Sequence, residues 1–252
     1  MKSAGRTFFV RSHEVFWSVA ELFREVRCRS CFRPMAGKDG TGAPLFFCGD
    51  CWRELQPSGG GRCPRCGEPT GAAPVAATPC GDCLASPPPW RNFYLHGDYS
   101  GLLRDLILRF KVGELPLGPA LGSLMAKSGV SAAQDLALLV PLPLHPARLR
   151  ERGFNQALEL ARCLKSDTRV LSPELLVRAR DNPPQRGLSR EERRRNMRGI
   201  FRTAKSVESR LILLVDDVLT TGATVREATR ALLAAGAAAV DVAVLAHTRF
   251  HH

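Results

Sequence analysis

The sequence contains no apolar run long enough to cross a membrane and no segment with the composition of a secretion signal. A membrane-spanning helix needs about 20 apolar residues, and the core of a signal peptide needs about 7 to 15. Residues 1–10 contain an apolar patch of only three residues. The motif Gly-x4-Gly-Lys-Ser/Thr is also missing, which excludes the common P-loop for nucleoside triphosphates. We therefore expect a cytoplasmic chain whose thiols stay reduced.

Aromatic residues are scarce, and acidic residues are outnumbered by basic ones. Aromatic residues make up 7% of the 252 residues, and 36 Lys and Arg face 24 Asp and Glu. The formal net charge is +12 and the isoelectric point lies near 9.8. This balance suits polyanionic partners such as phosphates, nucleic acid or a membrane surface, although a basic surface can also serve solubility alone.

Cysteine, by contrast, is abundant and regularly spaced. Eight of the nine cysteines form four Cys-x2-Cys pairs. A spacer of two residues lets a tight turn direct both sulfur atoms at one ion, so two pairs complete a tetrahedral site that suits zinc. Because four thiolates leave no open coordination position, we expect two structural zinc sites. The predicted ligands are Cys28, Cys31, Cys48, Cys51, Cys63, Cys66, Cys80 and Cys83.

The spacing leaves the pairing of the four cysteine motifs open. Sequential pairing joins the first motif to the second and the third to the fourth, which gives two successive zinc ribbons. Cross-braced pairing would instead join the first motif to the third. Disulfides and an iron–sulfur cluster are further alternatives, and a reducing compartment counts against the disulfides.

A helix and a linker flank the cysteine motifs. Residues 13–27 carry apolar side chains at helical spacing, which predicts an amphipathic helix docked on this protein or, alternatively, on a partner or membrane. Residues 85–89 are proline-rich and predict a stiff linker. We therefore divide the chain into an N-terminal helix over residues 1–27, a double zinc ribbon over residues 28–88 and an α/β domain over residues 89–252.

Strands and helices alternate beyond the linker, as expected for an α/β domain. Strands are predicted near residues 93–99, 136–140, 211–215 and 240–246, and helices near residues 102–110, 117–125, 154–164 and 225–235. Lys111 follows the first of these helices, and we expect it to be solvated, with contact to a phosphate as the alternative. Cys163 is predicted to be a packing residue.

Residues 211–224 are the most informative stretch of the sequence. An apolar strand ends in two adjacent carboxylates, Asp216 and Asp217, which can accept hydrogen bonds from vicinal hydroxyl groups. A loop of small residues and hydroxyls then leads into a helix, whose N-terminal N–H groups stabilise a phosphate monoester without any lysine. The loop consists of Thr220, Thr221, Gly222, Ala223 and Thr224. This pattern fits a sugar phosphate and resembles the phosphoribosyl pyrophosphate (PRPP) signature of type I phosphoribosyltransferases.

A second loop follows the predicted strand at residues 136–140. It contains Pro143, Leu144 and His145, and three arginines follow between residues 148 and 152. In open α/β sheets, ligands bind at the carboxyl ends of the strands, so this cationic loop is placed to meet a pyrophosphate. His145 on its own is predicted to be a surface histidine.

Between residues 178 and 202 lie nine arginines and three acidic residues. The turn-rich part can act as a lid over a polyphosphate, and the alternative is a solvated basic helix over residues 189–197. Phe201 is the single aromatic residue of this stretch, so base stacking on single-stranded nucleic acid is poorly supported there.

Together these motifs resemble the ComF family of bacteria over residues 15–247. The resemblance rests on the cysteine pairs and on residues 140–146, 152–156, 184–201 and 215–224. It implies a type I phosphoribosyltransferase-like fold, a mostly parallel sheet flanked by helices, behind a zinc-ribbon module. It also implies a role in natural competence, the uptake of single-stranded DNA.

The resemblance further implies roles for individual residues. Asp216 and Asp217 would hold the ribose hydroxyls of PRPP, and residues 220–224 its 5′-phosphate. Pro143, Leu144 and His145 would lie on the pyrophosphate side, and Mg²⁺ would be held mostly by substrate oxygens and water. In the related enzymes a variable hood selects the nucleobase, and here the zinc ribbons are candidates for that position.

Two functions follow from these expectations. The first is an enzyme in which a nitrogen nucleophile attacks the anomeric carbon of Mg·PRPP, serving DNA uptake or nucleotide salvage. The second is a non-catalytic adaptor that senses PRPP or a nucleotide and binds single-stranded DNA and a DNA-uptake helicase. Neither a general base nor the acceptor can be identified from the sequence.

Overall fold

A computed structural model of the chain describes residues 26–35, 46–57, 61–71, 78–133, 135–179 and 199–248. The predicted N-terminal helix lies outside the described residues up to residue 25. The lid or basic helix between residues 180 and 198, and the final pair of histidines, also lie outside them.

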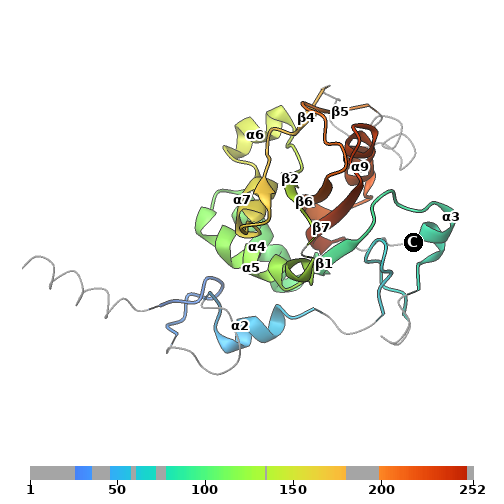
Figure 1. Ribbon diagram of the computed structural model, residues 1–252. Coiled ribbons are helices and arrows are strands. Elements are labelled where there is room, and N and C mark those ends of the chain that lie inside the picture. Colours follow the sequence, from blue (N-terminus) through green and yellow to red (C-terminus); the bar gives the residue numbers. More distant parts are fainter. Residues whose placement is uncertain are drawn as a thin grey trace, which may run out of the picture.

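A five-stranded sheet with the order β1-β7-β6-β2-β3 forms the centre of the molecule (Figure 1). All of its strand pairs are parallel. Its longest strands, β6 and β7, are rich in Val, Leu and Ala and are buried along most of their length, as expected for a parallel sheet covered on both faces. The strands are β1 (Phe93–Asp98), β2 (Leu138–Pro141), β3 (Val170–Leu171), β6 (Leu211–Leu219) and β7 (Ala239–His247). The predicted α/β class with a mostly parallel sheet is therefore confirmed.

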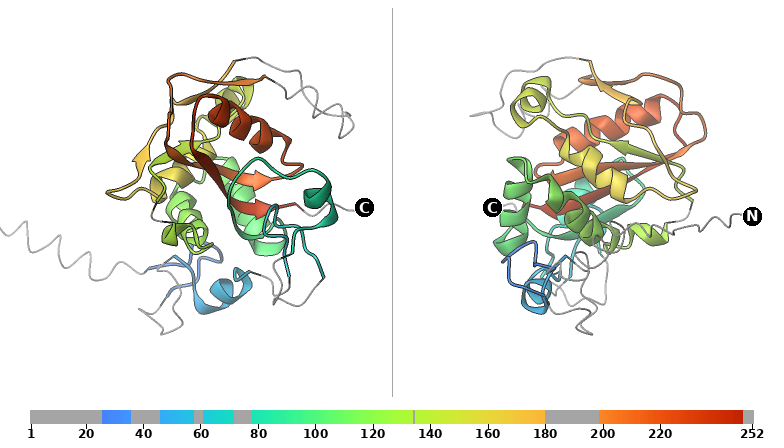
Figure 2. Two further views of the ribbon diagram at one scale, coloured as in Figure 1. Left: turned by 45° about the vertical axis from the view of Figure 1, so that its right-hand side comes forward. Right: turned by 90° about the vertical axis from the view of Figure 1, so that its left-hand side faces the viewer.

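Helices cover both faces of this sheet (Figures 1 and 2). Alternate side chains of β6 point to opposite faces. Leu213 and Val215 pack in one hydrophobic cluster with α4, α5 and α7, and Ile212 and Leu214 pack in a second cluster with α9. A small antiparallel pair, β4 (Leu176–Arg178) and β5 (Phe201–Thr203), lies on the α9 side. The helices are α2 (Gly49–Glu54), α3 (Gly81–Ala85), α4 (Gly101–Lys111), α5 (Gly118–Ala126), α6 (Pro146–Arg152), α7 (Gln156–Cys163) and α9 (Ala223–Ala234), with 3-10 turns at Leu115–Leu117 and Val130–Ala132.

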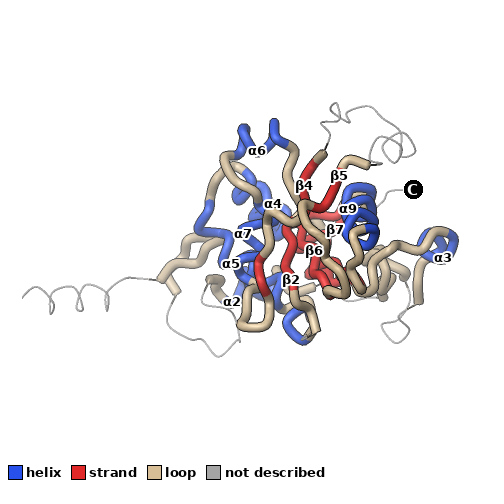
Figure 3. The backbone as a smooth tube through the Cα atoms, turned by 45° about the horizontal axis from the view of Figure 1, so that its top comes forward, coloured by secondary structure: helices blue, strands red, loops and turns tan. Residues whose placement is uncertain are grey.

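The two cysteine-rich segments pack on different sides of the sheet domain, as the positions of α2 and α3 in Figure 3 show. Cys28, Phe47 and Trp52 of the first segment belong to the same hydrophobic cluster as α4 and α5. The second segment is attached through Arg65, which donates hydrogen bonds to the carbonyl groups of Trp90 (2.6 Å) and Arg91 (2.7 Å). Both segments are therefore fixed directly to the domain that carries the sheet.

Candidate functional site

The acidic pair lies near the carboxyl end of β6. The Asp217 N–H donates to Asp216 Oδ1 at 2.8 Å, and the Val218 N–H donates to Asp217 Oδ1 at 2.7 Å. Burial, and after it the charge of Asp217, raises the pKa of Asp216 well above its usual range. Burial and the neighbouring charge thus favour the protonated form of Asp216.

Lys111, the last residue of α4, forms an ion pair with Asp217. The distance from Lys111 Nζ to Asp217 Oδ2 is 2.9 Å, and the side chains are only 18% and 14% exposed. The prediction that Lys111 is solvated was therefore wrong. The sequence did contain a signal, because Lys111 falls four residues after Ile107 and eight after Leu103, on the buried face of the helix.

The loop after β6 turns at Gly222, which precedes α9. Gly222 has a φ of 70°, a left-handed conformation that favours glycine. The Thr221 hydroxyl oxygen accepts a long hydrogen bond of 3.4 Å from the Ala223 N–H, and Thr220 is exposed. The first turn of α9, which includes Thr224, presents N–H groups without intrahelical acceptors on this side, as an anion site requires. We call residues 220–224 the phosphate loop.

The loop that follows β2 lies beside the acidic pair. Pro141 pairs with Val215, and the Leu142 N–H donates to the Val215 carbonyl at 2.8 Å, so Pro143, Leu144 and His145 emerge next to Asp216. His145 is partly buried and caps α6, since its Nδ1 accepts a hydrogen bond from the Ala147 N–H at 3.1 Å. The cap gives this histidine a local structural role. We call residues 142–146 the pyrophosphate loop, after the group that the sequence predicts it to face.

Asn155 holds the pyrophosphate loop to the next helix. Its Nδ2 donates to the Leu142 carbonyl at 3.0 Å, while its Oδ1 accepts from the Ala157 N–H at 3.0 Å and caps α7. The exposed residues Arg148 and Arg150 lie on α6 just beyond the loop. Two loops from neighbouring parallel strands thus flank the carboxylates at one edge of the sheet, where ligands of such folds bind.

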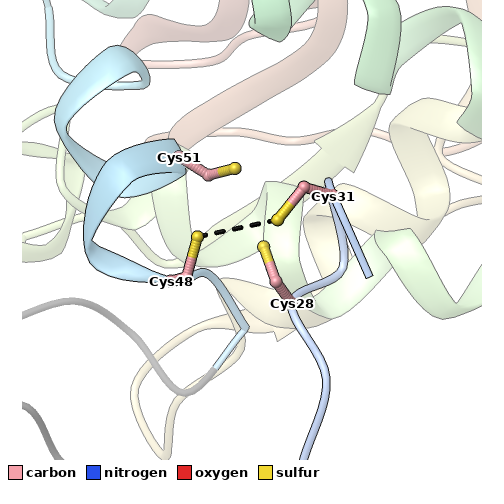
Figure 4. Close-up of side chains that lie close together, drawn as sticks. All are labelled: Cys28, Cys31, Cys48 and Cys51. Atoms are coloured by element: carbon pink, nitrogen blue, oxygen red, sulfur yellow. Dashed lines mark hydrogen bonds between the residues drawn. The ribbon is translucent and has the colours of Figure 1, made fainter. Parts of the chain in front are cut away.

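Each cysteine-rich segment gathers its four sulfur atoms into a group that could hold zinc. The groups are Cys28, Cys31, Cys48 and Cys51, and Cys63, Cys66, Cys80 and Cys83, each with its sulfur atoms within 4.8 Å of one another. Cys31 and Cys48 lie 3.7 Å apart at their sulfur atoms (Figure 4), as do Cys66 and Cys80. A zinc–sulfur bond of about 2.3 Å places tetrahedral thiolates about 3.8 Å apart, whereas a disulfide would need about 2.05 Å.

The grouping follows sequential pairing, so the cross-braced alternative does not apply, and the two groups fit a double zinc ribbon. Burial acts to raise the pKa of the Cys63 thiol, but backbone N–H groups, first that of Cys80, outweigh it and lower the pKa to about 7. The same balance lowers the pKa of Cys28 to about 7. A lowered thiol pKa favours the thiolate form that binds metal, whereas burial raises the pKa of Cys51 and Cys83 in the same groups to about 12.

A cavity of about 380 Å³ lies between the second ribbon and the phosphate loop. Thiols of this ribbon line one part of it, and zinc bound by them would take up only that part. His247, at the end of β7, also lines the cavity, and burial lowers its pKa to about 4. Other residues that line the cavity near the phosphate loop or on the ribbon side are Glu68, Asp82, Trp90, Thr220, Thr221 and Arg226. The resemblance made the zinc ribbons candidates for a hood, but the individual lining residues could not be predicted, because some of them lie more than 150 positions apart.

The fold and the loops define a phosphoribosyltransferase-type domain, and residues 126–250 match the phosphoribosyl transferase domain family. "DNA utilization protein YhgH" of Escherichia coli K12 is 36% identical over 193 residues, which cover 74% of this chain and 84% of that protein. "Competence protein F" of Haemophilus influenzae is 30% identical over 230 residues, 87% of this chain and 95% of that protein. "Competence protein ComFC" of Bacillus subtilis is 33% identical over 205 residues, 76% and 80% respectively.

With these relatives, the chain belongs to the ComF family, and the resemblance seen in the sequence is confirmed. No helix among the described residues is both long and apolar enough to span a bilayer.

Proposed function

We propose that this protein binds Mg·PRPP and transfers its ribose 5-phosphate group to a nitrogen nucleophile in the cytoplasm. The single observation that carries the proposal is the edge of the sheet where β6 ends. There the carboxylates of Asp216 and Asp217 lie between the phosphate loop and the pyrophosphate loop. A phosphate, two vicinal hydroxyls and a pyrophosphate, in that order, are the groups of PRPP.

Each part of the site then has one task. The phosphate loop holds the 5′-phosphate through backbone N–H groups and hydroxyls, and the carboxylates accept hydrogen bonds from the ribose hydroxyls. The pyrophosphate loop fixes the leaving group through its backbone, which is restricted by the ring of Pro143 and by the cap that His145 makes on α6. Bound Mg²⁺ would neutralise charge on the pyrophosphate, held by substrate oxygens, water and at most the carboxylate pair.

The cavity beside the second ribbon is the place for the acceptor. The cavity has a volume of about 380 Å³, at the small end of the roughly 300–1,000 Å³ of ligand pockets, and the acceptor would use the part that zinc leaves free. Glu68 and Asp82 offer carboxylates to N–H groups, while Leu219 and Trp90 offer apolar surface. A planar nitrogen heterocycle suits this lining, and the second ribbon then takes the part of a hood.

The test is pyrophosphate release from Mg·PRPP across a panel of nucleobases, with and without single-stranded DNA. We expect release with one class of acceptor and its loss in Asp217→Asn. The exposed Asp105, which pairs with Arg104 outside the site, provides the matched control Asp105→Asn. Release by neither protein with any acceptor would rule out the transferase.

A second candidate function is an adaptor in DNA uptake, favoured by the names of the relatives and by the net charge of +12. It would bind PRPP without turnover and hold single-stranded DNA together with a DNA-uptake helicase. A protein that binds nucleic acid phosphates releases their counterions. This release becomes less favourable as the salt concentration rises, so the affinity falls steeply. Affinity for a single-stranded oligonucleotide that stays constant from about 50 to 300 mM salt would therefore contradict it.

A further inference from the structure

The ion pair between Lys111 and Asp217 occupies the middle of the proposed PRPP site. The ammonium group lies 2.9 Å from the Asp217 carboxylate and 5.7 Å from the centre of the Tyr99 ring. Both partners of the pair are largely enclosed, unlike the solvated ion pairs of a protein surface. A ligand hydroxyl that is to reach Asp217 must therefore share this carboxylate with Lys111 or displace it.

The end of α4 lies near the segment that follows the pyrophosphate loop. Phe110, the residue before Lys111, meets Phe154 edge to face with ring centres 5.3 Å apart. Phe154 stands between α6 and α7, and the adjacent Asn155 binds the Leu142 carbonyl of the pyrophosphate loop. The ammonium group is thus anchored on a helix that packs beside the pyrophosphate side of the site.

The first zinc ribbon holds the last turn of α4. Arg109 donates to the carbonyl groups of Ser30 (3.2 Å) and Arg29 (3.3 Å), both inside the first Cys-x2-Cys turn. Its guanidinium group also lies 5.0 Å from the centre of the Phe32 ring and pairs with Glu114 at 2.7 Å. Because its planar guanidinium group is held on three sides, Arg109 is fixed in place two positions before Lys111.

We propose that Lys111 is a PRPP-binding residue whose ammonium group passes from Asp217 to the pyrophosphate when PRPP binds, and that the first zinc ribbon positions it through Arg109. In the free site the ammonium group balances the charge of Asp217, which lies against Asp216. When the ribose hydroxyls donate to the carboxylates, the flexible lysine stem lets the cation turn to the stronger anion. The cation then stabilises the charge that grows on pyrophosphate as the bond to the anomeric carbon breaks. This inference rests on the proposed function.

A lysine that merely blocks the empty site would have the opposite effect on affinity. Removing a block strengthens the binding of PRPP, whereas removing a ligand contact weakens it. Ribose 5-phosphate separates the two ideas, because it has the hydroxyls and the 5′-phosphate of PRPP but no pyrophosphate. The ratio of the two affinities therefore reports on the pyrophosphate contact alone.

The experiment is calorimetric titration of wild type and Lys111→Met with Mg·PRPP and with ribose 5-phosphate. Methionine keeps an apolar stem without the charge. We expect the affinity of Lys111→Met for Mg·PRPP to fall about ten-fold or more, the loss of one charge-assisted hydrogen bond, with ribose 5-phosphate bound as well or better. Arg104→Met, on the same helix but 51% exposed, should behave as wild type. Unchanged or tighter binding of Mg·PRPP by Lys111→Met, or an equal loss for both ligands, would overturn the inference.

The role of the ribbon is tested with Arg109→Gln, whose zinc content is measured alongside its affinities. We expect weaker binding of Mg·PRPP, unchanged binding of ribose 5-phosphate and wild-type zinc content. Wild-type affinity for both ligands would show that the ribbon does not position Lys111. A wild-type protein that fails to bind Mg·PRPP at all would instead refute the proposed function, and these outcomes are distinct.

Discussion

Asp216 and Asp217 are adjacent in sequence but face different surroundings. The pKa of Asp216 is raised by burial and by its neighbour, whereas Asp217 has the ammonium group of Lys111 at 2.9 Å. Adjacent carboxylates repel unless a cation or a hydrogen-bond donor intervenes, and in this structure Lys111 supplies the cation. The residue that keeps two acids together was not evident from the motif itself, since it comes from a helix about 100 positions earlier.

The buried side chain of His96 should make the stability of the protein depend on pH. Burial lowers its pKa below 6.5, and its Nε2 lies 2.8 Å from the Leu55 carbonyl of the first ribbon segment. Below pH 6.5 the unfolded chain takes up a proton that the folded chain resists, so stability is full above this pH and falls as the pH drops towards the lowered pKa. Chemical denaturation of wild type between pH 7 and 5 should show a steeper loss of unfolding free energy than His96→Gln. Parallel losses would contradict a neutral, buried His96.

At the scale of elements, the alternation of strands and helices could be predicted from apolar patterning, because β6 and β7 are rich in aliphatic residues and α4 has a regular apolar stripe. The phosphate loop was evident for the same local reason, since its residues are consecutive. The cavity beside the second ribbon could not be predicted, because Asp82 and Thr220 line one cavity only after the ribbon packs against the end of β6. Contacts between distant segments leave no periodic signal in one sequence.

If the acceptor binds in that cavity as proposed, a change in the lining should weaken acceptor binding and leave PRPP binding intact. Asp82→Asn removes one carboxylate from the lining while keeping the size of the side chain. We expect a KM for the acceptor raised about ten-fold, the effect of one lost charged hydrogen bond, with the affinity for Mg·PRPP unchanged. Steady-state kinetics with varied acceptor, together with calorimetry, make the measurement. A defect confined to PRPP binding would move the acceptor elsewhere.

At the scale of the whole molecule, the two ribbons differ in how they join the fold. Cys28 and Cys51 of the first ribbon belong to the hydrophobic cluster shared with α4, α5 and the sheet. The second ribbon contributes no cysteine to either of the hydrophobic clusters of the described residues and is attached through polar contacts, among them Arg65 with Trp90 and the largely buried ion pair of Arg62 with Asp98 (2.9 Å). The division of the chain at residues 27 and 88 remains a proposal, and the shared cluster shows that a boundary in sequence need not separate cores.

This difference predicts that disrupting the first cysteine group lowers the melting temperature more than disrupting the second. Cys31→Ser should lower the melting temperature by roughly 5–10 °C, since a loss of each kcal/mol lowers it by about 2–4 °C at this size and the damage reaches the main core. Cys66→Ser should lower it less. Differential scanning calorimetry with zinc determination measures both, and Cys163→Ser, outside both cysteine groups, is the control. An equal or reversed order would argue against a ribbon built into the core.

The PRPP site at the end of β6 is tested by calorimetric titration of the intact protein with Mg·PRPP, repeated with Asp217→Asn and with the exposed control Asp105→Asn. We predict one PRPP bound per chain in wild type and in the control, and an affinity lowered about ten-fold or more in Asp217→Asn, which loses charged hydrogen bonds to the ribose. Absence of binding in wild type, or equal binding by Asp217→Asn, would contradict a PRPP site at the end of β6.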